Sequence, residues 1–182
     1  MRHFACKLVL VAAGLGLVAP ASADGVAAQR VAYTTPAPTS LPTADRIVVR
    51  KSDRRLELLR RGEVLRSYKV ALGLQPLGHK ERSGDFRTPE GKYTLSRRNP
   101  RSDFFLSIQI SYPNDLDARA AKQNGWEPGG SIMIHGLPNV LKRDLTYYQT
   151  RDWTDGCIAV SNSDMVEIWL LTNDNTQIEI LP

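Results

Sequence analysis

The chain has 182 residues, with 24 Lys and Arg against 19 Asp and Glu, which gives a formal net charge of +5. This length is enough for one ordinary domain with short extensions. The weak positive charge suits an anionic polymer or a membrane surface. It is too small to indicate nucleic acid, and we expect no nucleic-acid partner.

Residues 1–23 have the pattern of a secretory signal peptide. A short basic leader precedes an apolar run from Leu8 to Ala19, and Ala21-Ser22-Ala23 is a small-residue cleavage site. The apolar run is too short to span a bilayer as a mature helix, and no later segment is long and apolar enough. We therefore expect an exported protein that starts at Asp24 and has no membrane span, with an uncleaved anchor as the alternative.

Cleavage would leave Cys157 as the single thiol, because the other cysteine, Cys6, lies in the leader. An unpaired cysteine in an exported chain indicates an intermolecular bridge or a free reactive thiol. A buried, inert cysteine is the remaining alternative. Turn-forming residues precede Cys157, which favours a sulfur at the mouth of a strand rather than in the core.

Residues 24–45 are rich in Ala, Thr, Ser and Pro, which predicts a flexible or partly extended linker. Residues 46–182 then form one domain, in which β-branched and alternating runs predict mostly strands. The predicted strands are 46–50, 56–59, 64–72, 92–97, 104–111, 132–134, 158–160 and 176–181.

Two short helices are predicted between these strands. One spans 115–123 with Asn114 or Asp115 as its cap, and the other follows Asn162-Ser163, where Asp164 and Glu167 fit a capping box. The expected fold is all-β, a sandwich or partly closed barrel of mixed strands with one or two short helices.

A long polar loop from Gly73 to Gly91 contains four glycines and two prolines. A loop of this length in a compact domain is usually functional or disordered. We predict that Lys80 and Arg87 hold a substrate carboxylate, with solvated loop charges as an equal alternative.

His135 ends one predicted strand, and Cys157 precedes another. A thiol needs a neighbouring base to act as a nucleophile, and imidazole is the usual base. A thiol redox role is disfavoured because no second cysteine would resolve a disulfide. We expect no metal site, because His79, the remaining candidate ligand after His135 and Cys157, has no ligand spacing.

Three motifs resemble the L,D-transpeptidase catalytic domain family (YkuD-type). In chain order they are Thr88-Pro89-Glu90-Gly91, Ile134-His135-Gly136 and Thr154-Asp155-Gly156-Cys157-Ile158. The resemblance covers Arg46 to Leu181. It implies a β-rich fold and a cysteine enzyme without a cofactor that acts on peptidoglycan peptide stems, in the periplasm or at the cell wall.

The resemblance also implies roles for individual residues. Cys157 would be the nucleophile and His135 the base. Backbone N–H groups around Gly156 and Cys157 would form an oxyanion hole, and the Gly136 carbonyl would be a candidate to orient the imidazole. Thr154 is also expected among the oxyanion-hole or orienting residues. The residues expected to bind substrate are Lys80, Arg87, Thr88, Tyr112, Arg151 and Asp155. Arg151 and Trp153, with Tyr147 and Tyr148, are candidates for a basic and aromatic lid, although a plain surface loop is the alternative.

Two positions depart from the family pattern. Asp155 stands where histidine usually precedes the Gly-Cys pair, and Ala159 stands where arginine usually follows. The pattern is closer to a branch that includes hydrolases, which cut peptide links or free wall-linked lipoproteins, so acyl transfer and hydrolysis both stay open. A non-catalytic module that binds the cell wall is the third alternative. For Asp155, we consider orientation of His135, pairing with Arg151 and a hydrogen bond within its own turn.

Overall fold

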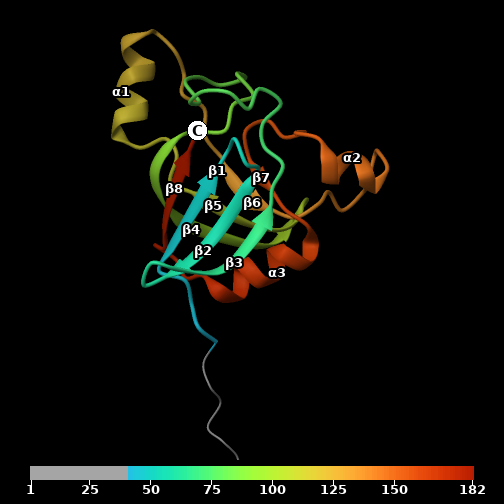
Figure 1. The fold of residues 1–182 in the computed structure, drawn as a ribbon. Helices are drawn as coiled ribbons and strands as arrows, with labels where there is room; N and C mark the ends of the chain where they lie inside the picture. Colours follow the sequence, from blue (N-terminus) through green and yellow to red (C-terminus); the bar gives the residue numbers. More distant parts are fainter. Residues whose placement is uncertain (1–40) are drawn as a thin grey trace, which may run out of the picture. The chain divides into compact units, whose positions relative to one another are not determined.

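The computed structural model describes residues 41–182, so the predicted signal peptide and most of the predicted linker lie outside the described residues. The described chain is mostly strands, with short helices around them (Figure 1). The strands are β1 (Arg46–Arg50), β2 (Arg55–Arg60), β3 (Glu63–Lys69), β4 (Gly91–Ser102), β5 (Phe105–Ile110), β6 (Met133–His135), β7 (Ile158–Ala159) and β8 (Gln177–Leu181). The helices are α1 (Asp115–Gln123), α2 (Leu145–Thr150) and α3 (Asn162–Leu171). The predicted β-rich class is confirmed.

All eight strands belong to one mixed sheet, in the order β3-β2-β1-β8-β4-β5-β6-β7. The 12-residue strand β4 joins its two halves, because its first residues pair with β8 and its later residues pair with β5. Two register shifts between β4 and β5 mark bulges, and bulges increase the bend of a strand. The sheet therefore curls around its core.

The two edges of the curled sheet meet just beyond β3. Ala71 forms an antiparallel bridge with Ala159 of β7, and Gly73 forms a parallel bridge with Thr154. Because β3 and β7 lie at opposite ends of the strand order, these bridges give the partly closed barrel. They also place the Gly73–Gly91 loop beside the segment that leads into β7.

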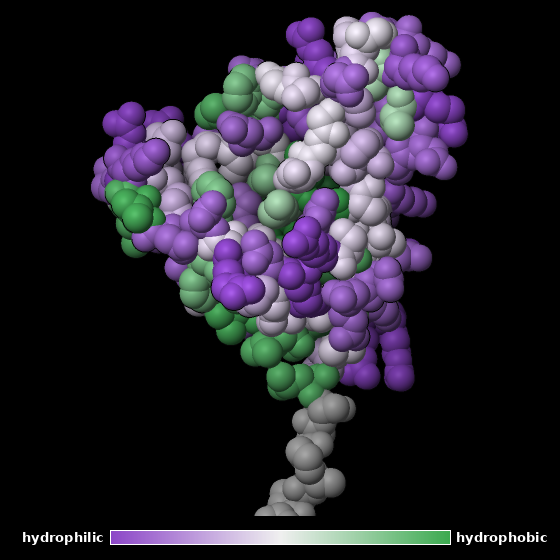
Figure 2. Space-filling model, turned by 180° about the vertical axis from the view of Figure 1, so that it is seen from behind, coloured by the Kyte–Doolittle hydropathy of each residue, from purple (hydrophilic) through white to green (hydrophobic). Residues whose placement is uncertain are grey.

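The core lies inside the curl and beneath α3. Inward-facing residues of β1 and β2 are fully buried, among them Ile47 and Leu56, as are Met165 and Ile168 of α3. These α3 residues repeat at helical spacing and present one apolar face to the sheet. Figure 2 shows that the rear surface is largely hydrophilic, with apolar residues gathered at its lower end and on the side that carries α2.

The structure corrects two details of the predicted helices. Helix α3 begins earlier than the expected capping box, because the Ser161 side chain is the cap and accepts from the Asp164 N–H. Helix α2 lies in a stretch with no apolar periodicity, and Asp144 caps it by accepting from the Tyr147 N–H. Helix α1 has the predicted bounds, with Asn114 as its cap. No helix within residues 41–182 is long and apolar enough to cross a membrane.

A buried lysine fastens the Gly73–Gly91 loop to the end of β1. The Lys51 ammonium donates to the Gly78 carbonyl at 2.6 Å, the Thr88 carbonyl at 2.9 Å and a Glu90 carboxylate oxygen at 2.8 Å. Burial lowers the pKa of Lys51, and the bond to Glu90 opposes this effect. The three acceptors compensate the charge, so one side chain ties the first half of the loop, at Gly78, to its end at Thr88 and Glu90.

Replacing Lys51 with Met should destabilise the domain, because it leaves Glu90 and two carbonyls without their shared donor. We expect the free energy of unfolding to fall by about 3 kcal/mol, measured by urea denaturation. The double variant Lys51→Met/Glu90→Gln should recover part of the loss, since it removes the unpaired carboxylate. A single-variant loss below about 0.5 kcal/mol would show that the ammonium contributes little beyond a surface substitution.

Candidate active site

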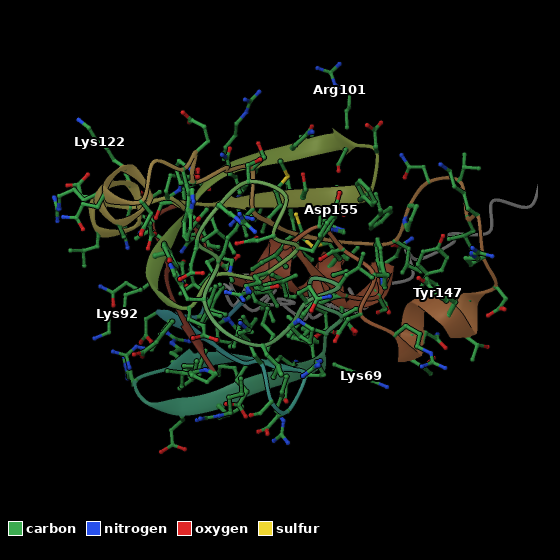
Figure 3. All side chains as sticks on the ribbon, turned by 90° about the horizontal axis from the view of Figure 1, so that it is seen from above. Lys69, Lys92, Arg101, Lys122, Tyr147 and Asp155 are labelled. Carbon is green, nitrogen blue, oxygen red and sulfur yellow. The ribbon has the colours of Figure 1, made fainter. Side chains whose placement is uncertain are left out.

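A groove of about 680 Å³ opens beside β6 and β7. It brings together four of the residues predicted for catalysis, the oxyanion hole or substrate binding, namely His135, Thr154, Asp155 and Cys157. Its wider lining comes from the turn between β4 and β5, the segment before β6, and the segment that contains α2. Figure 3 shows Asp155 near the centre of the molecule and Tyr147 on α2 to one side of it.

Parallel pairing of β6 and β7 sets the positions of the His135 imidazole and the Cys157 thiol. Ile134 lies opposite Ile158, and His135 lies opposite Ala159. Side chains alternate along a strand, so His135 and Ala159 share one face, and Cys157, two residues before Ala159, projects on that same face. This register brings both side chains into the groove although they are 22 positions apart in the sequence.

A tight turn holds the thiol at the start of β7. The Thr154 hydroxyl donates to the Cys157 carbonyl at 2.7 Å and accepts from the Gly156 N–H at 3.2 Å. Gly156 has a φ of +128°, and a Cβ there would lie 2.6 Å from the Arg87 carbonyl oxygen. Only glycine fits this close passage of the Gly73–Gly91 loop behind the turn.

The same turn decides which amides are free. We predicted an oxyanion hole from the backbone N–H groups around Gly156 and Cys157, and the Gly156 N–H is already bonded to Thr154. The Cys157 N–H precedes β7 and has no partner among residues 41–182. Of this pair, the Cys157 amide is therefore the donor available to a developing oxyanion.

His135 is buried and oriented by its neighbour. Its Nδ1 lies 2.7 Å from the Gly136 carbonyl oxygen, which can only accept, so Nδ1 carries the proton and donates. Burial lowers the pKa of His135 to about 4, and the bond to Gly136 opposes that shift. The imidazole is therefore neutral at pH 7, with an unprotonated Nε2 that can accept a proton.

Cys157 is partly exposed, and its thiol donates to the Ser131 carbonyl at 3.6 Å. Burial raises the pKa of this thiol, and the nearby charge of Asp155 adds to the increase. A hydrogen bond from the Met133 backbone and the charge of Lys80 oppose both effects. The resting site is thus a neutral thiol beside a neutral imidazole, not a thiolate–imidazolium pair.

Aromatic rings form one wall of the groove. Trp153 packs edge-on to His135, with ring centroids 5.6 Å apart, and Tyr148 packs edge-on to Trp153 at 5.1 Å. Phe104 lies 4.6 Å from His135 and 6.1 Å from Trp153, centroid to centroid. Trp153 and the two tyrosines were predicted as lid candidates and do line the groove. Phe104 was not expected there, because it was assigned only to the face of a strand.

Five residues that were predicted to bind substrate do not line this groove. Lys80 is buried in an ion pair with Asp85 at 2.7 Å, and Arg87 lies 3.0 Å from Glu81. Their charges are used within the loop in this structure, and their role toward substrate stays a prediction.

The other three make mainly structural contacts or lie at the surface. Thr88 accepts from the Gly73 N–H at 3.0 Å, and Tyr112 donates to the Pro128 carbonyl at 3.0 Å. Arg151 is exposed at the end of α2. No group of three or more metal-ligating side chains comes together within the described part of the chain.

Sequence and structure comparisons identify relatives of this domain. One relative is YafK of Escherichia coli K12, which is named as a provisional L,D-transpeptidase. It is 38% identical to this chain over 129 residues, and the match covers 68% of this chain and 45% of YafK. The chain thus spans about half the length of the curated relatives it matches.

Solved structures agree on the fold. The helical cell shape determining protein Pgp2 of Campylobacter jejuni aligns with a TM-score of 0.56 and 27% identity over 74% of this chain and 46% of Pgp2. Bd1075 of Bdellovibrio bacteriovorus has a TM-score of 0.51 and 24% identity over 74% of this chain and 46% of Bd1075, which supports the fold alone. The profile of the L,D-transpeptidase catalytic domain matches residues 44–180. With this match over most of the chain, the protein belongs to the L,D-transpeptidase catalytic domain (YkuD) family.

Proposed function

We propose that this protein is an exported cysteine enzyme that acts on peptidoglycan peptide stems by acyl transfer through a thioester. The observation that carries the proposal is the presence of Cys157 and His135 in one groove, presented by two paired strands. Family membership supports the substrate class, as does the similarity to Pgp2, which is named for determining cell shape. Export and a periplasmic or wall location rest on the leader pattern in residues 1–23.

The proposed reaction starts from the neutral pair. Cys157 Sγ attacks a stem carbonyl while its proton passes to Nε2 of His135, and the carbonyl becomes an oxyanion near the Cys157 N–H. The C–N bond then breaks, and the imidazolium gives its proton to the departing amine. A thioester and a neutral imidazole remain. An incoming amine attacks the thioester and loses a proton to His135. The C–S bond then breaks, and the Cys157 sulfur takes that proton back from His135, which completes the transfer and restores the neutral pair.

Hydrolysis of the same thioester is the second candidate function. The observation that favours hydrolysis is the residue before the Gly-Cys pair. Asp155 places an exposed carboxylate in the groove at the position where the family pattern usually has histidine. Water would take the place of the acceptor amine, and the products would be a shortened stem or a released wall-linked lipoprotein.

Replacing Cys157 with Ala should lower the rate of product formation from isolated peptidoglycan stems by at least about 10³-fold, because no other group can form the thioester. Replacing His135 with Ala should lower the rate by about 10²- to 10⁴-fold, since the proton acceptor is lost. Mass spectrometry of the products measures both effects and separates new cross-links from hydrolysis. The exposed Ser52→Ala variant is the control, and full turnover by Cys157→Ala would refute the thiol mechanism.

Alkylation of the mature chain should report the neutral resting pair. Because burial and Asp155 raise the pKa of Cys157, reaction with iodoacetamide should be slow at pH 7 and rise steadily above the ordinary range of a thiol, about 8.5. On the acidic side, the turnover rate should fall near pH 4, where His135 becomes protonated, and not near the ordinary histidine pKa of about 6.5. A fast alkylation plateau between pH 4 and pH 7 would instead indicate a preformed thiolate–imidazolium pair.

A further inference from the structure

The Asp155 side chain is unused by the protein itself. His135 directs Nδ1 to Gly136. The turn is held by the Thr154 hydroxyl, not by the Asp155 carboxylate. Within residues 41–182, no ion pair links Asp155 to Arg151 or to any other cation. All three roles considered from the sequence are thus unfilled, and an exposed carboxylate is left in the groove beside Cys157.

With Asp155 included, the described lining of the groove carries two carboxylates against one cation, which favours a positively charged ligand. Asp103, in the turn between β4 and β5, also lines the groove, is exposed and has no cationic partner in the described part of the chain. Among the described lining residues, Lys142 is the only Lys or Arg, although the chain as a whole carries a net charge of +5. The stacked rings of Phe104 and Trp153 add aromatic faces, which attract ammonium groups.

Asp155 also affects the nucleophile. Its carboxylate disfavours the Cys157 thiolate, so a cation bound to Asp155 would cancel this effect at the moment of attack. Other groups that act on the thiol are the Met133 backbone amide and Lys80, and Lys80 is already paired with Asp85. Asp155 is the exposed member of this set, so it is the one that a ligand can reach.

We propose that Asp155 is a specificity-determining residue that binds an ammonium group of the peptide substrate next to the scissile bond. The proposal rests on the proposed function and narrows its substrate class to stems with a free amine at this position. The ammonium belongs either to the acyl donor or to the leaving-group side of the scissile bond. Binding it both selects the substrate and favours ionisation of the thiol, which would otherwise be suppressed.

Binding tests this directly in the Cys157→Ala variant, which cannot turn substrate over. The probes are two synthetic stem peptides, with one lysine-type amine on the acyl side or on the leaving-group side, each compared with its N-acetylated form. Isothermal titration calorimetry should show about tenfold tighter binding for one of the two amines over its acetylated form. The side on which the preference appears identifies the source of the ammonium.

Adding Asp155→Asn to this variant should reduce the preference to less than about twofold, because the charge is lost and the shape is kept. Asp155→Glu should restore part of it. Glu63→Gln, which removes a negative charge from exposed strand β3, is the matched control and should leave the ratio unchanged. Equal binding of amine and acetylated peptides, no binding of either, or an unchanged preference in Asp155→Asn would each overturn the proposal.

A second readout separates this proposal from the proposed function. In the enzyme with Cys157 intact, a slow-turnover analogue of the preferred amine peptide should shift the pH profile of iodoacetamide alkylation to lower pH. The acetylated form of this analogue should leave the profile unchanged. An amine preference in binding without any product would contradict the proposed function and leave the ammonium site in place. Product formation with equal kcat/KM for amine and acetylated stems would contradict the ammonium site and leave the function in place.

Discussion

The proposed chemistry of this domain depends on the parallel pairing of β6 and β7. The two strands form a short ladder, yet its register decides whether His135 and Cys157 face the same groove. A slip of one residue would turn one of these side chains to the opposite face. The Ala71–Ala159 bridge holds the register from outside the pair, and the bond from the Val160 N–H to the His135 carbonyl extends the ladder just beyond β7.

The environment of the pair explains why it is kept neutral. His135 is buried among Phe104, Trp153 and the strands, and no carboxylate is bonded to its Nδ1, which donates to a backbone carbonyl. Without a negative partner, neither imidazolium nor thiolate is favoured before substrate arrives. Under the proposed mechanism, activation would then depend on a charge that the substrate itself brings, which is why a free carboxylate at Asp155 is significant for the choice of substrate.

Much of the fold was predictable because local patterns agree with it. Helix α1 has a cap and a stop signal at its ends, and the Arg61-Gly62 turn closes its hairpin with two left-handed residues, as such turns require. The short helix α2 was missed because six residues without apolar periodicity give no helical signal, although Asp144 is a usable cap. The α3 cap was misplaced because Ser161 and Asp164 are both good capping residues, and the choice depends on where β7 ends.

The site was predictable to the level of its motifs. His135 and Cys157 could be named because both adjoin short buried strands. The cations Lys80 and Arg87 could not be assessed, since the acids that pair with them, Asp85 and Glu81, lie in the same loop and their contacts depend on its folded shape. The sequence also contains no sign that Phe104 enters the groove, because this follows from the bend of β4 and β5.

The central claim is that a stem peptide becomes covalently attached to the sulfur of Cys157. The most direct measurement is an acid quench of the mature chain during turnover of peptide stems, followed by intact mass spectrometry and peptide mapping. The claim predicts a mass increase equal to the acyl part of the stem, located on the fragment that contains Cys157 and lost on treatment with hydroxylamine. Continued product formation with no adduct at any quench time, or an adduct on a different residue, would contradict it.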